Sequence, residues 1–169
     1  MPLSFPSSVC RSIEQSRRLQ NGFEIEYAFQ RFAIEKSIAE FTLFGLCPPT
    51  VVRDWGFELF NNDVAALVSE VTTFQERLDE RIGSLSGNHD LMRYHWEVIE
   101  QTRDFRIGEF LEPALGYQVI EETVNLMNSL MTGMREQASS ILGERLQRRC
   151  DIINGCPPRA RKARLHIVV

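Results

Sequence analysis

A heptad pattern that begins at residue 60 constrains the fold of this chain. Apolar side chains recur there at alternating steps of four and three residues, and they are Phe60, Val64, Leu67, Val71, Phe74 and Leu78. This spacing puts one apolar side chain on the same face at every helical turn, whereas a strand would need alternation every two residues. The pattern therefore predicts a long amphipathic helix whose apolar face must be covered.

A second heptad pattern predicts one uninterrupted helix over about residues 117–150. It contains a methionine stripe made of Met127, Met131 and Met134. Methionine packs adaptably against different neighbours, so this stripe suits either a core or a partner surface. The sequence leaves open whether the two apolar seams cover each other within one chain. If they meet a second chain instead, the nine seam residues named so far form the interface.

Two further helices are predicted from weaker periodicity and from their ends. One occupies about residues 23–47 and stops there because Pro48 and Pro49 cannot donate backbone hydrogen bonds. The other follows a turn at residues 86–88 and ends near Pro113. The sequence carries no strand alternation, so the predicted fold is all-α, a four-helix-bundle-like domain of long antiparallel helices joined by short turns.

The chain has 169 residues, which fits one domain. We expect a helical bundle over residues 22–153. A flexible N-terminal arm over residues 1–21, with at most a short helix around Ser12 to Leu19, precedes it, because proline and serine are frequent at the start of the chain. A basic C-terminal tail over residues 154–169 follows a break at Gly155 and two prolines.

The charges are unevenly distributed along the chain. Residues 143–169 carry seven basic and two acidic side chains, a local charge of +5, within a chain of net charge −4. The preceding residues therefore carry −9 and would repel a polyanion. Only the C-terminal region is expected to attract nucleic acid or another acidic partner.

Six basic residues of that region form two clusters. They are Arg148 and Arg149, followed after a spacer by Arg159, Arg161, Lys162 and Arg164. This pattern resembles a bipartite nuclear localisation signal, which implies binding to an import receptor, and the same clusters suit nucleic-acid phosphates. Because no secretory signal precedes the first predicted helix, we expect an intracellular protein, cytoplasmic or nuclear.

The tail segment from Arg161 to His166 has the spacing Arg-x4-His and resembles the motif of HEPN-domain ribonucleases, which are also helical bundles. The resemblance covers six residues and implies RNA cleavage by Arg161 and His166. The polar residue that usually follows the arginine is Lys162 in this chain.

The remaining candidate signals predict neither a metal site nor a cofactor. The carboxylates lack the Glu-x-x-His pairs of a di-metal bundle, and the four cysteines match no zinc spacing. His95 falls on an apolar seam, where we expect a hydrogen-bonded core histidine. No apolar run reaches the roughly 18 residues that a membrane span needs.

These observations favour a non-enzymatic α-helical interaction or assembly module that self-associates and uses its basic tail for targeting or tethering. A nucleic-acid-associated protein that binds phosphates through the tail is the first alternative. A HEPN-like ribonuclease that uses Arg161 and His166 is the second.

Overall fold

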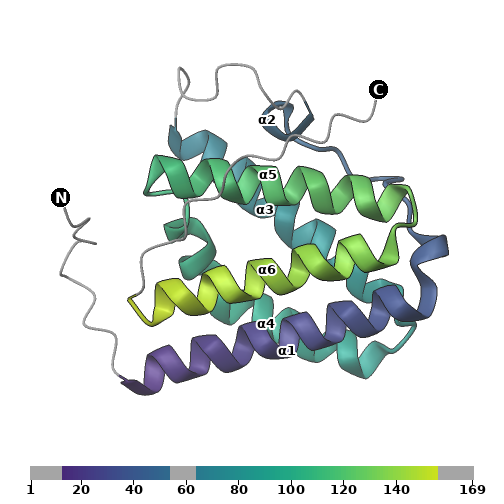
Figure 1. The fold of residues 1–169 in the computed structure, drawn as a ribbon, viewed down its shortest axis with the longest axis horizontal. Helices are drawn as coiled ribbons and strands as arrows, with labels where there is room; N and C mark the ends of the chain where they lie inside the picture. Colours follow the sequence, from purple (N-terminus) through teal and green to yellow (C-terminus); the bar gives the residue numbers. More distant parts are fainter. Residues whose placement is uncertain (1–12, 54–63, 156–169) are drawn as a thin grey trace.

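The computed structural model describes residues 13–53 and 64–155, and in these residues it contains six α-helices, a short 3-10 helix and no strand (Figure 1). The elements are α1 (Ile13–Ser37), η1 (Ile38–Glu40), α2 (Thr50–Arg53), α3 (Val64–Ser84), α4 (His89–Gly108), α5 (Pro113–Met131) and α6 (Arg135–Ile153). The predicted all-α, bundle-like fold is confirmed.

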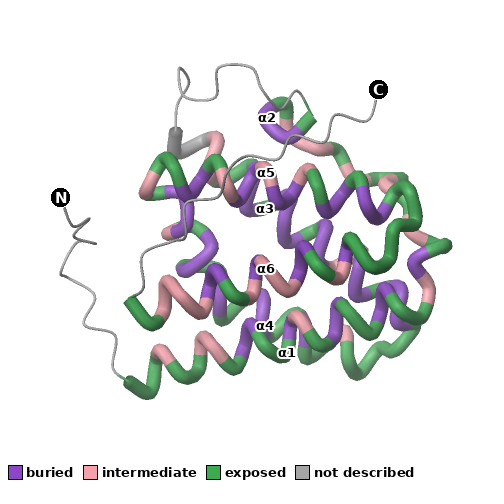
Figure 2. The backbone as a smooth tube through the Cα atoms, in the orientation of Figure 1, coloured by how far each residue is buried: buried purple, intermediate pink, exposed green. Residues whose placement is uncertain are grey.

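The five long helices form two layers (Figure 1). Helices α1, α6 and α5 lie side by side in one layer, and α3 and α4 lie behind them. Helices α1 and α4 are antiparallel: the start of α1 meets the end of α4, where Gly22 lies beside Thr102, and further along Phe29 meets His95. Each long helix therefore turns one side toward a shared interior (Figure 2).

The apolar seam of α3 forms the centre of this interior. Val71, Leu78 and Ile82 are fully buried, and they belong to one core cluster with Ile120 and Leu126 of α5. Burying an apolar side chain of this size contributes roughly 1.5–3 kcal/mol relative to leaving it exposed. The seam of α3 is thus covered by helices of the same chain.

The helix predicted over residues 117–150 is two helices, α5 and α6, so the expectation of one continuous helix is wrong. Gly133 has a φ of +69° and follows the end of α5. Its N–H donates to Leu130 O at 3.2 Å, and the N–H of Met134 donates to Ser129 O at 2.8 Å. These two bonds form a Schellman motif, which ends a helix on a left-handed glycine. The chain then reverses, and α6 packs antiparallel to α5.

The first helix also differs from its predicted range. Helix α1 begins at Ile13, so part of the predicted arm is helical, and an exposed Arg18–Glu14 ion pair of 2.7 Å spans its first turns. It ends at Ser37, well before the two prolines. The reason is tertiary packing, because the following segment places Phe41 and Leu43 against the core.

The start of α4 agrees with its predicted signal, whereas its end lies earlier than predicted: α4 ends at Gly108, and Pro113, which was expected to stop it, belongs to the next helix. The Asn88 side chain accepts hydrogen bonds from the backbone of Asp90 and Leu91, both at 3.1 Å, and caps α4 as its N-cap residue. Pro113 stands in the first turn of α5, where a missing N–H costs nothing.

Candidate functional site

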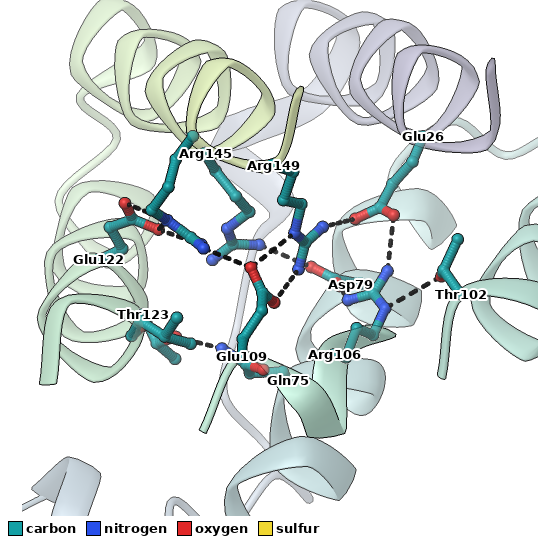
Figure 3. Close-up of polar contacts among 12 residues, drawn as sticks. Glu26, Gln75, Asp79, Thr102, Arg106, Glu109, Glu122, Thr123, Arg145 and Arg149 are labelled. Atoms are coloured by element: carbon teal, nitrogen blue, oxygen red, sulfur yellow. Dashed lines mark hydrogen bonds and ion pairs between the residues drawn. The ribbon is translucent and has the colours of Figure 1, made fainter. Parts of the chain in front are cut away.

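Eight charged side chains meet in the interior between the five long helices (Figure 3). Four are carboxylates and four are guanidinium groups, so their formal charges cancel, and all are at least 95% buried. They form one alternating line of seven ion pairs in the order Arg145, Asp79, Arg106, Glu26, Arg149, Glu109, Arg148, Glu122. We call this line the buried ion network.

The first half of the network joins α1, α3 and α4, and through Arg145 it also reaches α6. Arg106 donates from Nη1 to Asp79 Oδ2 at 2.8 Å and from Nη2 to Glu26 Oε2 at 2.5 Å. Its Nε donates to Thr102 Oγ1 at 3.2 Å, and that hydroxyl donates to Val98 O at 2.8 Å. A planar guanidinium presents its donors as a fork, so this buried cation is bound by three side chains at once.

The second half joins α6 to α5 and to Glu109, which directly follows α4. Arg148 forms a bidentate pair with Glu122, with Nε–Oε1 at 3.0 Å and Nη2–Oε2 at 2.8 Å, and its Nη1 also donates to Glu109. Arg149 links Glu109 to Glu26 through contacts of 3.3 and 3.4 Å. The guanidinium of Arg149 also lies over the Phe23 ring, 4.5 Å from its centroid.

Neighbouring charges keep the carboxyl groups of Glu109 and Asp79 ionised despite their burial. Burial opposes ionisation of Glu109, but Arg148 and Arg149 outweigh it and lower the pKa of this carboxyl to about 2. Burial likewise opposes ionisation of Asp79, and Arg106 and Arg145 hold its pKa below the ordinary value. For Arg149 burial is the stronger effect, and the pKa of this guanidinium falls below its usual value.

The sequence places these groups inward by the same spacing that builds the core. On α6 the buried apolar residues Ala138 and Ile141 are followed at steps of four and three residues by Arg145 and Arg148. The apolar seam therefore continues as arginine on the same face. This continuation is the signal that sequence reasoning missed, since arginine is ordinarily assigned to the surface.

The structure corrects the assignment of Arg148 and Arg149 to a polyanion or import-receptor site. Both side chains are buried and paired with carboxylates, so neither is free to contact an external phosphate. The other residues of that predicted site are Arg159, Arg161, Lys162 and Arg164, and they lie outside the described residues. His166 also lies outside them.

The predicted interface seams divide between the core and the surface. Val71, Phe74, Leu78 and Met127 are buried in the chain's own core, and Leu67 packs half-buried against it, so the interface reading is wrong for the four buried residues. Met131 and Met134 flank the turn between α5 and α6 and are exposed by 58% and 52%. Phe60 and the side chain of Val64 lie outside the described residues.

His95 is buried as expected, but the hydrogen bond expected for it is absent. Neither ring nitrogen has a partner among the described residues, and the ring packs edge-on against Phe29 at a centroid distance of 5.0 Å. Burial lowers the pKa of His95, against the opposing effect of Glu26 and Asp79. The imidazole is therefore held in its neutral form.

A second feature is an exposed apolar surface along α1 and α4. On α1, Ile25 and Phe32 each stand three residues after a residue that contacts α4, namely Gly22 and Phe29. On α4, Leu91 and Tyr94 each stand four residues before a residue that contacts α1, namely His95 and Val98. Ile25, Phe32, Leu91 and Tyr94 are 37–55% exposed, so they lie on the solvent side of the contact between the two helices. We call them the α1/α4 apolar face.

The described residues hold neither a cluster of metal-ligating side chains nor a membrane-spanning helix. They contain no group of three or more His, Cys, Asp or Glu side chains placed to hold a metal ion. Within the same residues, no helix is long and apolar enough to cross a bilayer. Comparisons of the chain with protein-family models, with curated proteins and with solved structures find no match.

Proposed function

We propose that this protein is an α-helical interaction module that self-associates through the α1/α4 apolar face. The observation that carries the proposal is the presence of four large, half-exposed apolar side chains on two adjacent helices. A patch of exposed apolar side chains is typical of an interaction site.

The buried ion network supports this function by fixing the helices that present the face. Glu26 anchors α1 and Arg106 anchors α4, and the two are paired directly at 2.5 Å. Buried ion pairs contribute little net stability compared with apolar packing, but they admit few alternative helix registers. Phe32 and Tyr94 are therefore presented on a rigid two-helix surface, which reduces the entropy lost on binding.

The charges beside the face favour a second copy of the chain as the partner. Because α1 and α4 are antiparallel, the exposed Glu24 and Glu97 lie toward one end of the face, and the exposed Arg31 and Arg93 lie toward the other. A two-fold axis through the middle of the face brings the acidic end of one copy onto the basic end of the other. The resulting interface is a bundle of two α1 and two α4 helices.

Light scattering on the size-exclusion peak of the untagged full chain tests this proposal. We expect a dimer for the wild type, and monomers of unchanged helix content for Phe32→Asp and for Tyr94→Asp. Phe44→Asp is the matched control, because Phe44 is 86% exposed but lies outside the face. A wild-type monomer at high concentration, or a dimer that survives both substitutions, contradicts self-association through this face.

The second candidate function is polyanion binding through the remaining tail cluster, for which four basic residues between positions 159 and 164 are the supporting observation. Binding to nucleic acid should then weaken steeply with salt and disappear when residues 157–169 are removed. If the ligand is instead an import receptor, the receptor should bind the same segment in the absence of nucleic acid. RNA turnover that requires His166 would instead favour the ribonuclease alternative, and His166→Ala tests it.

A further inference from the structure

The turn between α5 and α6 interrupts an apolar pattern that the sequence carries straight through it. Apolar residues recur at alternating steps of three and four on both sides of the turn, and they are Tyr117, Ile120, Val124, Met127, Met131, Met134, Ala138 and Ile141. This spacing keeps all eight residues on one face of a single helix. The sequence around the turn is thus also compatible with one continuous helix.

The turn differs from a continuous helix at very few backbone angles. Thr132 has φ −91° and ψ 1°, Gly133 has φ +69°, and Met134 has φ −77° and ψ 77°. In an α-helix φ is about −63° and ψ is about −42°. The large differences therefore fall on Gly133 and Met134, and a hinge of this kind needs only a few residues that absorb the change.

The start of α6 is weakly defined. Its N-cap residue is Met134, and no side-chain hydrogen bond caps this end among the described residues. Methionine is not one of the polar residues preferred at this position. In a continuous helix the last carbonyls of α5 would accept hydrogen bonds from the first N–H groups of α6, so neither end would need a cap.

The two seam residues at the turn lack the cover that their neighbours have. Met127, Ala138 and Ile141 are buried, whereas Met131 and Met134 are 58% and 52% exposed. If two continuous helices from two copies lie antiparallel and cross at the turn, the methionines of one copy contact those of the other. A second copy of the chain would therefore cover them.

We propose that two copies of this chain exchange α6, and that α5 and α6 of each copy then form one continuous helix over residues 113–153. In this exchanged dimer Arg145, Arg148 and Arg149 of one copy pair with the network carboxylates of the other. All contacts of the closed chain except those of the turn are kept, which makes such exchange a low-cost route to a dimer. Because α6 must leave the core to exchange, the dimer forms during folding at high protein concentration. It does not depend on the α1/α4 apolar face.

Refolding from urea at low and at high protein concentration tests the exchange. The chain used carries Phe32→Asp, so that the α1/α4 apolar face contributes no dimer. We expect a monomer after dilute refolding. After concentrated refolding we expect a dimer of unchanged helix content that persists on dilution, because its release requires unfolding. Light scattering and circular dichroism measure both states, and a chain that refolds only to monomer at every concentration overturns the proposal.

A substitution in the hinge should shift the outcome in a known direction. Gly133→Ala should raise the ratio of dimer to monomer by at least about tenfold, because alanine is disfavoured at positive φ and favoured in a helix, and each dimer contains two hinges. Gly155→Ala is the matched control and should leave the ratio unchanged. Gly155 follows α6 with φ +71°, and a Cβ at either glycine meets nothing within 4 Å. Equal ratios for the two variants overturn the proposal.

A distance measurement separates the exchanged dimer from any other dimer. Asn125 and Gln147 are exposed on α5 and α6, and the nearby Glu122 and Arg148 are paired in the closed chain. Spin labels at positions 125 and 147 therefore lie across one helix pair in the closed chain, but about 33 Å apart in a continuous helix that rises ~1.5 Å per residue.

The labelled chain has its native cysteines replaced by serine and is diluted into unlabelled chains before refolding, so that only distances within one chain are measured. The isolated dimer should show the longer distance, and the dilutely refolded monomer the shorter one. A dimer that keeps the shorter distance overturns the exchange of α6.

Discussion

Arg106 and Asp79 face each other across α3 and α4 with 2.8 Å between Nη1 and Oδ2, and neither side chain reaches solvent. The pair is the second link from the Arg145 end of the buried ion network, since Arg106 also contacts Glu26, and Asp79 also contacts Arg145. Removing one member leaves its partner charged in the interior. The structure therefore predicts that single substitutions here are far more damaging than at surface ion pairs.

We expect Arg106→Met to lower the free energy of unfolding by about 3–5 kcal/mol, because it leaves buried carboxylates uncompensated. Urea denaturation followed by circular dichroism measures the loss. The control is Arg18→Met, which removes the exposed ion pair with Glu14 and should cost less than about 1 kcal/mol. Similar losses for the two variants would contradict the expectation that an uncompensated buried charge costs far more than a broken surface ion pair.

The lowered pKa of Glu109 predicts loss of stability in acid. Its carboxyl has a pKa of about 2 when folded and an ordinary value of 4.5, so the unfolded chain binds the proton first as the pH falls. The stabilisation is complete above pH 4.5 and is lost progressively toward pH 2. Glu109→Gln should be less stable at neutral pH but should show a shallower loss over this range. Equal slopes for the variant and the wild type, measured by urea titrations at successive pH values, would contradict this assignment.

His95 predicts a separate dependence at milder pH. Burial lowers its pKa below the ordinary 6.5, so the unfolded chain takes up a proton that the folded chain resists. Stability should therefore decrease as the pH falls below about 6.5, and His95→Gln should remove this part of the slope. His89→Gln, at the exposed start of α4, should keep the slope of the wild type. A slope that is unchanged in His95→Gln would assign the effect to another group.

Gly83 predicts a steric effect close to the same histidine. A Cβ at this position would lie 2.8 Å from Met92 Sδ, 2.9 Å from Phe29 Cε1 and 3.0 Å from His95 Nδ1. We expect Gly83→Ala to destabilise the protein by about 1–3 kcal/mol through overpacking between α3, α4 and α1.

Gly108 provides the matched helical control, because a Cβ there meets nothing within 4 Å. Gly108→Ala should be neutral or slightly stabilising, since alanine loses less backbone entropy than glycine in a helix. Calorimetric midpoints of both variants check the pair of expectations. A Gly83→Ala variant as stable as Gly108→Ala would mean that helix propensity, rather than the contacts of Gly83, sets the result.

The sequence predicts the all-α class and most helix positions because apolar periodicity and capping are local signals. The cap at Asn88 and the position of Pro113 follow from the chemistry of single residues. The break at Gly133 does not, because the apolar spacing passes through it without interruption, and only the backbone geometry shows that the helix reverses.

The buried ion network could not be predicted from the sequence for a different reason. Each carboxylate lies on a different segment, and residues as distant as Glu26 and Arg149 become partners only after folding. A cluster such as Arg148 and Arg149 therefore resembles a solvated basic patch when it is considered alone. The local signal for the network is that the apolar seam of α6 continues into Arg145 and Arg148. It indicates buried arginines only if arginine is accepted at a core position.

The order of charges along the chain has a consequence for how the protein is made. All four carboxylates of the network and Arg106 precede residue 135, whereas the other three arginines arrive together on the last described helix. A nascent chain that has not yet released α6 from the ribosome would have to bury four negative charges against one positive charge. Closure of the bundle must therefore wait until α6 has left the ribosome, and a chain truncated before α6 would be a polypeptide that cellular proteases recognise as unfolded.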